Sequence, residues 1–278
     1  MKKLIVKILS ILGLKQLFYS KRKKVKLFYQ LHLRNLFNLY VISQNLNYKS
    51  IPIIIISFNQ LYYLKQLIDF LIKHNYKNIV IIDNNSTYQP LLDYFKSIEA
   101  TVTIHKLNEN FGHLVFWKNK ELYKKYSKGY YVITDPDIVP VEGCPEDFVL
   151  HFKKILDKNP QVTKVGFSLK VDNIPDSNPN KQKIIDWEQQ FWRNKTREGD
   201  YNAPLDTTFA LYRSNYEYLE QDFYRAIRTE VPYQVRHGGW YIDAKNLSDE
   251  QIYYFETCNE SSAWRIDNMG NLKNKELL

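Results

Sequence analysis

Short runs of β-branched and aromatic residues alternate with amphipathic stretches between residues 51 and 135, and this alternation most constrains the fold. The four runs are residues 51–57, 78–83, 101–105 and 129–135. The first of them, Ile51-Pro-Ile-Ile-Ile-Ile-Ser57, is typical of a strand buried on both faces. The intervening stretches, including residues 88–99 and 113–127, have helical spacing. The pattern predicts an α/β fold with a mostly parallel sheet flanked by helices. Further strands are expected at 165–171 and 207–212.

Polar clusters follow three of these runs, at the point where each predicted strand ends. They are Ser57-Phe58-Asn59, Asp83-Asn84-Asn85 and Asp135-Pro136-Asp137. The carboxyl ends of parallel strands meet at one edge of a sheet, and open α/β sheets bind their ligands there. The sequence therefore predicts a binding site built from these three clusters.

The carboxylates of Asp135 and Asp137 are the sharpest chemical signal in the chain. Two carboxylates at a strand end make a hard oxygen site that suits Mg²⁺ or Mn²⁺. Pro136 favours an extended backbone at Asp135, in agreement with a strand end. The alternative is an acidic turn, because Asp and Pro are common turn residues. The position after the fourth strand of an α/β pattern favours the metal site.

These clusters belong to a longer series of motifs that includes Asn108-Glu-Asn-Phe-Gly112 and Thr134-Asp-Pro-Asp-Ile138. With them, residues 50–140 resemble a glycosyltransferase of the GT-A fold, close to glycosyltransferase family 2. The resemblance covers about a third of the chain and depends on the order and spacing of short motifs. It implies a GT-A fold, a nucleotide-sugar donor and Mn²⁺ or Mg²⁺ as the cofactor.

By this resemblance, Ser57 and Asn59 would border the nucleotide, and Asp83 would accept a hydrogen bond from the base, typically uracil. Asp135 would approach the ribose or a metal-bound water, and Asp137 would bind the metal that bridges the donor diphosphate. The remaining donor-site candidates are Asn84, Asn85, Asn110 and Gly112. Alternatively, Ser57 and Asn59 could cap a helix, and Asp83 could serve a dinucleotide ribose. Against the dinucleotide, the chain contains neither G-x-G-x-x-G nor a Walker A sequence.

The segment Arg236-His-Gly-Gly-Trp-Tyr-Ile-Asp243 is the main candidate in the second half of the chain. GT-A enzymes often add a late His to the metal or the diphosphate, so the resemblance makes His237 a third metal candidate. Arg236 could pair with the phosphates. The alternative is a structural histidine among aromatic residues that fill the core.

An inverting transfer also needs a general base that takes the proton of the acceptor hydroxyl. The candidates are Asp206 and Glu188, and Asp206 is preferred because it precedes a predicted strand that could hold it rigidly. The chain departs here from the family pattern, which usually places a Glu-Asp pair in this half. The base and the stereochemical outcome therefore stay open.

Positive charge is concentrated at the N-terminal end. Residues 1–50 contain eleven of the 39 Lys and Arg and none of the 30 Asp and Glu, so the remainder, with 28 basic and 30 acidic residues, carries −2. We predict a basic amphipathic helical arm over residues 1–49, followed by a transferase domain over 50–278 with a donor-binding half (50–140) and an acceptor half (141–278). The arm is too interrupted by Lys7 and Lys15 for a membrane-spanning helix, and no cleavage site follows it. It suits an anionic membrane surface, or alternatively it packs on the body.

The leading interpretation is a metal-dependent glycosyltransferase that moves a sugar, expected from a UDP-sugar, to a glycan or lipid-linked acceptor in surface polysaccharide or lipopolysaccharide synthesis. The expected location is the inner face of the cytoplasmic membrane, and the isolated Cys144 and Cys258 suit a reducing cytoplasm. Nucleic acid is not expected as a partner, because the body is nearly neutral.

Two alternatives remain. A sugar nucleotidyltransferase shares a related sheet but normally has a Gly-rich, Arg-containing loop after its first strand, and Ser57-Phe-Asn-Gln60 is not one. A non-catalytic glycan- or membrane-binding protein on a decayed transferase fold would not need both Asp135 and Asp137.

Overall fold

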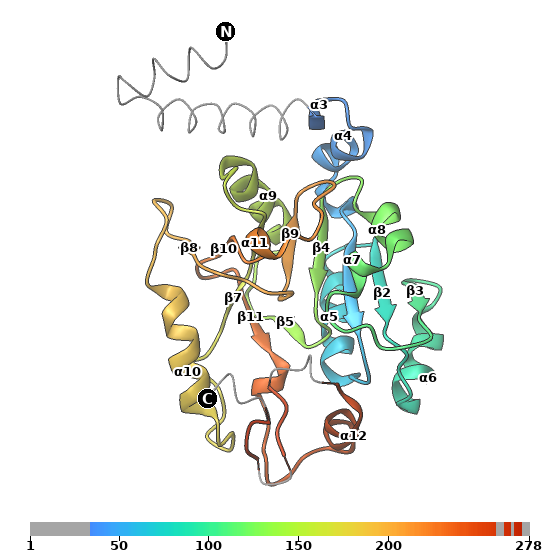
Figure 1. Cartoon of the computed structure of the whole chain (residues 1–278), viewed down its shortest axis with the longest axis vertical. Helices are drawn as coiled ribbons and strands as arrows, with labels where there is room; N and C mark the ends of the chain where they lie inside the picture. Colours follow the sequence, from blue (N-terminus) through green and yellow to red (C-terminus); the bar gives the residue numbers. More distant parts are fainter. Residues whose placement is uncertain (1–33, 260–263, 268–269, 274–278) are drawn as a thin grey trace, which may run out of the picture.

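The computed structural model describes residues 34–259, 264–267 and 270–273 (Figure 1). In this part of the chain the main sheet has eight strands in the order β3-β2-β1-β4-β9-β6-β10-β8. The strands are β1 Ile53–Ser57, β2 Ile79–Asp83, β3 Thr103–Lys106, β4 Tyr131–Thr134, β6 Lys164–Gly166, β8 Tyr201–Asn202, β9 Ala210–Tyr212 and β10 Ala226–Arg228. Strands β1 to β4 pair in parallel, as the sequence predicts. Strand β9 then runs antiparallel to both β4 and β6, and β8 closes the edge antiparallel to β10.

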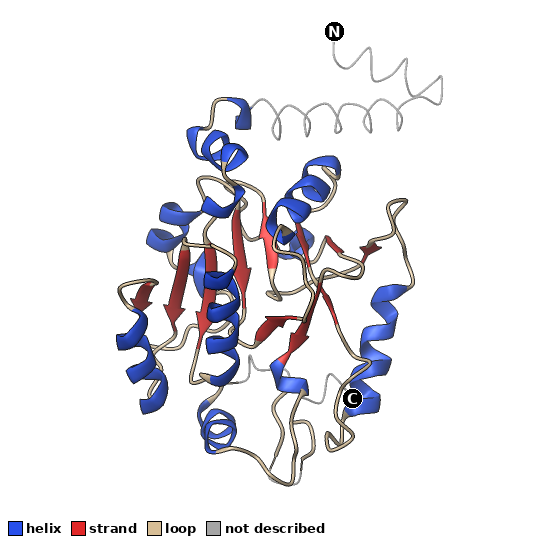
Figure 2. Cartoon of the chain, turned by 180° about the vertical axis from the view of Figure 1, so that it is seen from behind, coloured by secondary structure: helices blue, strands red, loops and turns tan. Residues whose placement is uncertain are grey.

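Helices cover both faces of this sheet (Figure 2). Successive side chains of a strand point to opposite faces, so Ile53 and Ile55 pack with the helices of one face, and Ile54 and Ile56 with those of the other. The first face carries α5 Tyr62–Lys73, α6 Gln89–Ile98 and α9 Phe148–Lys158; the second carries α7 Val115–Lys118, α8 Lys120–Tyr126 and α11 Glu220–Phe223. Burial on both faces explains why the first strand is apolar throughout.

The stretch 113–127, expected as one helix, forms two. The backbone of Asn119 is extended, which ends α7, and its side chain accepts hydrogen bonds from the amides of Glu121 and Leu122 at the start of α8. Asn is among the preferred N-cap residues, so one side chain both interrupts the pattern and restarts the helix. The strand expected at 165–171 is likewise divided into β6 and β7 Ser168–Leu169.

A second, three-stranded sheet lies beside the main one, in the order β5-β11-β7 within the described residues. Strand β5 Ile138–Pro140 follows β4 almost directly, and it pairs antiparallel with β11 Gln234–His237, so that His237 lies opposite Ile138. The short helix η4 Gly238–Trp240 continues β11. This pairing brings the 236–243 segment to the end of β4.

Helix α12 Asp249–Thr257 lies beyond the carboxyl ends of β1 and β2 (Figure 1). The Glu250 carboxylate accepts hydrogen bonds from the amides of Leu61 and Tyr62, at the start of α5. The hydroxyl of Tyr253 donates to Thr87. Helix α10 Lys181–Gln189 and the turn η3 Gln190–Trp192 stand at the other side of the molecule.

The opposite end of the sheet carries α3 Arg34–Leu36, α4 Leu39–Leu46 and η2 Tyr48–Ser50. The amide side chain of Gln44 exchanges two 2.8 Å hydrogen bonds with the backbone of Tyr130, which fixes α4 beside β4. Residues 1–33 of the predicted arm lie outside the described residues. No helix in the described ranges is long and apolar enough to cross a bilayer.

Candidate active site

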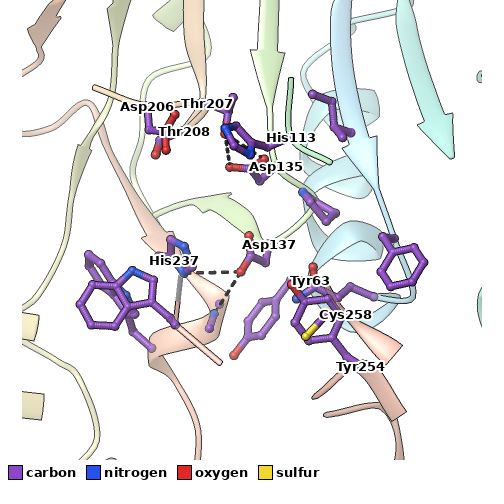
Figure 3. A pocket seen from close by; sticks show the side chains of 18 of the residues that line it. Tyr63, His113, Asp135, Asp137, Asp206, Thr207, Thr208, His237, Tyr254 and Cys258 are labelled. Carbon is purple, nitrogen blue, oxygen red and sulfur yellow. Dashed lines mark hydrogen bonds and ion pairs between the residues drawn. The ribbon is translucent and has the colours of Figure 1, made fainter. Parts of the chain in front are cut away.

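A cavity of about 1120 Å³ opens at the carboxyl ends of β1 and β4 (Figure 3). Its wall joins both predicted halves of the chain, with Asn84, Asn110 and Asp135 from the first half and Asp206 and His237 from the second. Ligand cavities of α/β proteins occur at this edge of the sheet. We therefore take this cavity as the candidate active site.

Asp137 is held at the junction of the two sheets and is only 6% exposed. Its backbone carbonyl accepts a 2.7 Å hydrogen bond from the amide of Gly238, and its Oδ2 accepts a 3.2 Å bond from the amide of Gly239. The same Oδ2 lies 3.4 Å from Nδ1 of His237. The His237 ring stacks on the buried ring of Trp240, with centroids 5.0 Å apart and planes within 13°. The carboxylate and the imidazole therefore face each other in fixed orientations.

This pair fits a divalent cation. Nδ1 of His237 is buried and has no hydrogen-bond partner among the described residues, although a carboxylate oxygen lies beside it. Buried polar atoms nearly always have a hydrogen-bond partner. An imidazole nitrogen that lacks one and faces a carboxylate can therefore form, with that carboxylate, a pair of metal ligands. In the part of the chain that the structure describes, no group of three or more His, Cys, Asp or Glu could hold a metal. Mg²⁺ and Mn²⁺ suit such a site, because Mg²⁺ usually keeps several waters and takes phosphate oxygens beside few protein ligands.

Asp135 turns away from this pair and toward the main sheet. Its carboxylate accepts hydrogen bonds of 2.9 and 3.2 Å from the hydroxyl of Thr207. Burial, followed by the negative charges of Asp137 and Asp206, raises the pKa of Asp135 to about 8. A nearby positive charge would stabilise the ionised form of the Asp135 carboxyl and lower its pKa again.

The two candidate bases differ in their surroundings. Asp206 is exposed and lines the cavity. Glu188 is buried and forms a 2.8 Å ion pair with Arg228, which is itself buried. Burial raises the pKa of Glu188, and the positive charge of Arg228 opposes that effect.

The donor-site candidates divide into two groups. Asn84, Asn110 and Gly112 line the cavity. Hydrogen bonds join them. The side-chain amide of Asn84 donates to the backbone carbonyl of Gly112, and the backbone amide of Gly112 donates to the side-chain oxygen of Asn110. Oδ1 of Asn84 is buried and has no hydrogen-bond partner in the described ranges.

The other donor-site candidates lie outside the cavity wall as the described residues define it. Ser57, Asn59 and Asp83 are buried, and Asn85 is exposed. Asp83 accepts a 3.0 Å bond from the amide of Ser86, and burial raises its pKa. The Asn59 side chain accepts from two backbone amides of the loop after β2 and donates to Thr257 on α12.

Arg236 also lies outside the cavity wall. Its guanidinium stands over the ring of Tyr241, 5.7 Å from the centroid, and donates to Gln66 on α5 at 3.4 Å. Neighbouring residues of a strand point to opposite faces, so His237 and Arg236 do not share one side of β11.

Two residues that contact the aspartates have no counterpart among the sequence candidates. Thr207 directly follows Asp206, and its hydroxyl reaches Asp135. Gly239 brings its amide to Asp137, and a Cβ there would lie 3.1 Å from the ring of His237. The pair Gly238-Gly239 directly follows His237 in the sequence and could have indicated a close backbone approach at this site. Nothing local in the sequence links Thr207 to Asp135.

No protein-family model matches the chain, and no curated protein matches it in sequence. Among solved structures, the chain is similar to the mannosyltransferase PcManGT from Pyrobaculum calidifontis in complex with GDP-Man and Mn²⁺, with 12% identity and a TM-score of 0.44 over 74% of this chain and 60% of that one. It is also similar to residues 1–349 of TarS from S. aureus, with 14% identity and a TM-score of 0.43 over 68% of this chain and 60% of that one. The same TarS segment in complex with UDP gives a TM-score of 0.43 at 14% identity, over 67% of this chain and 60% of that one. The chain thus spans about three fifths of the length of these structures.

Proposed function

We propose that this chain is a metal-dependent glycosyltransferase that moves a sugar from a nucleotide-diphosphate donor to a glycan or lipid-linked acceptor. The observation that carries the proposal is the pair formed by Asp137 and His237, 3.4 Å apart, with an orphaned imidazole nitrogen. The pair stands in a large cavity at the carboxyl ends of parallel strands, where a nucleotide is expected.

In this proposal Asp137 and His237 would hold Mn²⁺ or Mg²⁺. The cation supplies stabilisation of the negative charge that the leaving nucleotide diphosphate gains. Gly239 keeps the Asp137 carboxylate in place through its amide, and Trp240 keeps the His237 ring in plane. Asp135 turns from the pair toward the main sheet, where it would approach the ribose, and Thr207 fixes its orientation.

The donor nucleotide, for which we propose UDP, would be bound by Asn84, Asn110 and Gly112, which line the same cavity. The unpaired Oδ1 of Asn84 is available to a donor hydroxyl or base N–H. Asp83 remains our candidate for base recognition, although it lies behind the cavity wall and is bonded to Ser86. Base recognition by Asp83 therefore requires the loops after β1 and β2 to adjust.

Asp206 takes the proton of the acceptor hydroxyl in this scheme. A general base must reach the substrate, and Asp206 is exposed to the cavity, whereas Glu188 is committed to Arg228. Two aromatic rings that also line the cavity, Trp187 at 40% and Tyr224 at 48% exposure, favour a sugar acceptor. Such rings offer a large apolar face at low entropic cost, which suits the apolar face of a pyranose.

We also propose that the protein works on the inner face of the cytoplasmic membrane, in surface polysaccharide or lipopolysaccharide synthesis. Helices α3 and α4 and the turn between them leave large apolar side chains exposed, among them Phe37 at 82% and Leu46 at 87%. They lie within the first 50 residues, which contain eleven basic and no acidic residues. Apolar area together with positive charge is the combination that binds anionic bilayers. Removing residues 1–26 should weaken sedimentation with phosphatidylglycerol vesicles and leave donor hydrolysis intact; unchanged sedimentation would contradict the membrane role.

The central test is calorimetric titration of UDP into the protein with and without Mn²⁺. We expect binding that requires Mn²⁺, and a loss of at least about tenfold in Asp137→Asn and His237→Asn, because even changes to the groups that support metal ligands typically cost about 10- to 100-fold in affinity. Asp172→Asn is the matched control, since Asp172 is an exposed carboxylate paired with Lys170. Unchanged affinity in Asp137→Asn contradicts the proposed site. Metal-dependent binding without hydrolysis or transfer of any UDP-sugar favours the non-catalytic alternative.

A further inference from the structure

The segment 204–207, which carries Asp206 at the cavity wall, is held by two buried basic side chains, one of which, Arg228, also contributes to that wall. We propose that Lys164 and Arg228 are positioning residues that fix the carboxylate of Asp206 by binding the backbone carbonyls of this segment. The inference rests on the proposed function, in which Asp206 receives the acceptor proton. It assigns a role to buried polar groups that the metal and donor sites do not use.

Lys164 lies on β6 and is fully buried. Its Nζ donates a 2.9 Å hydrogen bond to the backbone carbonyl of Asp206 and a 3.0 Å bond to the hydroxyl of Tyr212. The same nitrogen lies 3.6 Å from the ring centroid of Phe223. Lysine is almost never fully buried unless it is paired, because removing its charge from water is costly. Here the hydrogen-bond partners are one tyrosine hydroxyl and the backbone carbonyl of the proposed base itself.

Arg228 holds the same segment two residues earlier. It ends β10, and its Nε donates a 2.7 Å hydrogen bond to the carbonyl of Pro204. Nη1 donates to Glu188 at 2.8 Å, and the guanidinium lies 4.0 Å from the ring centroid of Phe191. Because the guanidinium is planar, contacts with Glu188 and Phe191 fix the direction in which Nε points. Glu188 thereby acts on Asp206 through Arg228.

The residues between and after these carbonyls are also fixed. Leu205 is buried against Gly166, at a site where a Cβ on the glycine would lie 2.6 Å from the leucine side chain. Thr207 is tied to Asp135 by its hydroxyl. Four consecutive residues are therefore anchored, and Asp206 is the exposed carboxylate that this segment brings to the cavity wall.

The expected benefit is precision in the proton transfer. A base must lie within hydrogen-bond reach of the hydroxyl that it deprotonates, and a displacement of about 1 Å can lower a rate by about 10²-fold. Loosening either carbonyl contact should move Asp206 without touching the donor. The turnover number should therefore fall while the KM for the donor stays unchanged.

The experiment uses hydrolysis of a UDP-sugar, with water as the acceptor, in the presence of Mn²⁺. UDP-glucose, UDP-galactose and UDP-N-acetylglucosamine are each tested on the full chain, and the best substrate is kept. We expect Lys164→Met to lower kcat by about tenfold or more with little change in donor KM. Tyr212→Phe is the matched control: it removes the other partner of Lys164 and leaves the Asp206 carbonyl bonded, so kcat should stay near that of the wild type.

A double-mutant cycle separates positioning from general damage. If Lys164 acts through Asp206, then Lys164→Met combined with Asp206→Asn should be no slower than Asp206→Asn alone. Losses that multiply, or an unchanged kcat in Lys164→Met, overturn the inference. If Lys164→Met does not fold, Glu188→Gln carries the same cycle, since it releases Arg228. If the wild-type protein neither hydrolyses a UDP-sugar nor binds UDP in the presence of Mn²⁺, the proposed function is overturned as well.

Discussion

Burial of Lys164 gives the free energy of unfolding a pH dependence whose sign and size follow from the structure. Loss of hydration lowers the pKa of Lys164 from 10.5 to about 7. The charged groups that face it are Asp206 and Asp135, which raise its pKa, and Arg228, which lowers it further. In the unfolded chain the same amine keeps its proton until about pH 10.5.

Between these two pKa values the unfolded chain therefore binds more protons than the folded protein. Under that condition the free energy of unfolding rises with pH, by up to about 1.4 kcal/mol per pH unit for one proton. From pH 7.5 to 9.5 the contribution of Lys164 amounts to as much as about 3 kcal/mol. The contribution levels off above the pKa of the unfolded state and below that of the folded state.

The assay is urea unfolding of the wild type and Lys164→Met at pH 7.5, 8.5 and 9.5, followed by tryptophan fluorescence. The variant leaves the Asp206 carbonyl and the Tyr212 hydroxyl without a donor, an offset of about 1–3 kcal/mol for each unsatisfied group. This offset does not change with pH below the pKa of the buried Tyr212, which lies well above its usual value of 10.0. The difference in free energy of unfolding between the two proteins should therefore grow with pH. The exposed Lys120→Met serves as the control and should follow the wild type. Parallel curves for wild type and Lys164→Met would refute the reasoning.

Three further substitutions test the packing around the site. Gly166→Ala should lower the free energy of unfolding by at least about 2 kcal/mol in a urea titration, because its Cβ would lie 2.4 Å from the carbonyl oxygen of Phe209. Asn59→Ala removes three side-chain hydrogen bonds and places Ala at a φ of 47°. We therefore expect the free energy of unfolding to fall by about 3 kcal/mol and proteolysis near Thr257 to become faster. Unchanged cleavage would show that α12 is held by other contacts. Asn119→Ala deletes the cap of α8 and should cost about 1 kcal/mol, with Asn119→Asp restoring most of it.

The first half of the sheet could be predicted from the sequence because its signals are local. A run such as residues 53–56 is apolar at every position, and this identifies a strand covered on both faces without knowledge of its neighbours. The polar residues after each run then had to meet at one edge, because parallel strands place their carboxyl ends together. This reasoning put Asp135, Asp137 and Asn84 near one cavity, where the structure has them.

Other parts of the site depend on pairings over long sequence separations. His237 reaches Asp137 because β11 pairs with β5 in one register, and local composition does not specify the partner of a strand of three or four residues. The same holds for Glu188, whose carboxylate and buried partner Arg228 are 40 residues apart. Ser57 and Asp83 end the expected strands and Asn59 follows the first of them, yet the contact of Asn59 with α12 could not be predicted, because nothing near it in the sequence indicates that helix.

The aspartate pair occupies the junction between the two sheets, and this explains why its two carboxylates have different partners. Strand β4 ends at Thr134 in the main sheet, and β5 begins at Ile138 in the small one, so Asp135-Pro136-Asp137 is the whole connection. Asp135 consequently contacts Thr207 on the main-sheet side, and Asp137 contacts His237 at the end of β11 and Gly239 in η4. A change in the angle between the sheets must therefore alter the separation of the two carboxylates. In the proposed reaction, the contact with the metal and the contact with the ribose are coupled through this one turn.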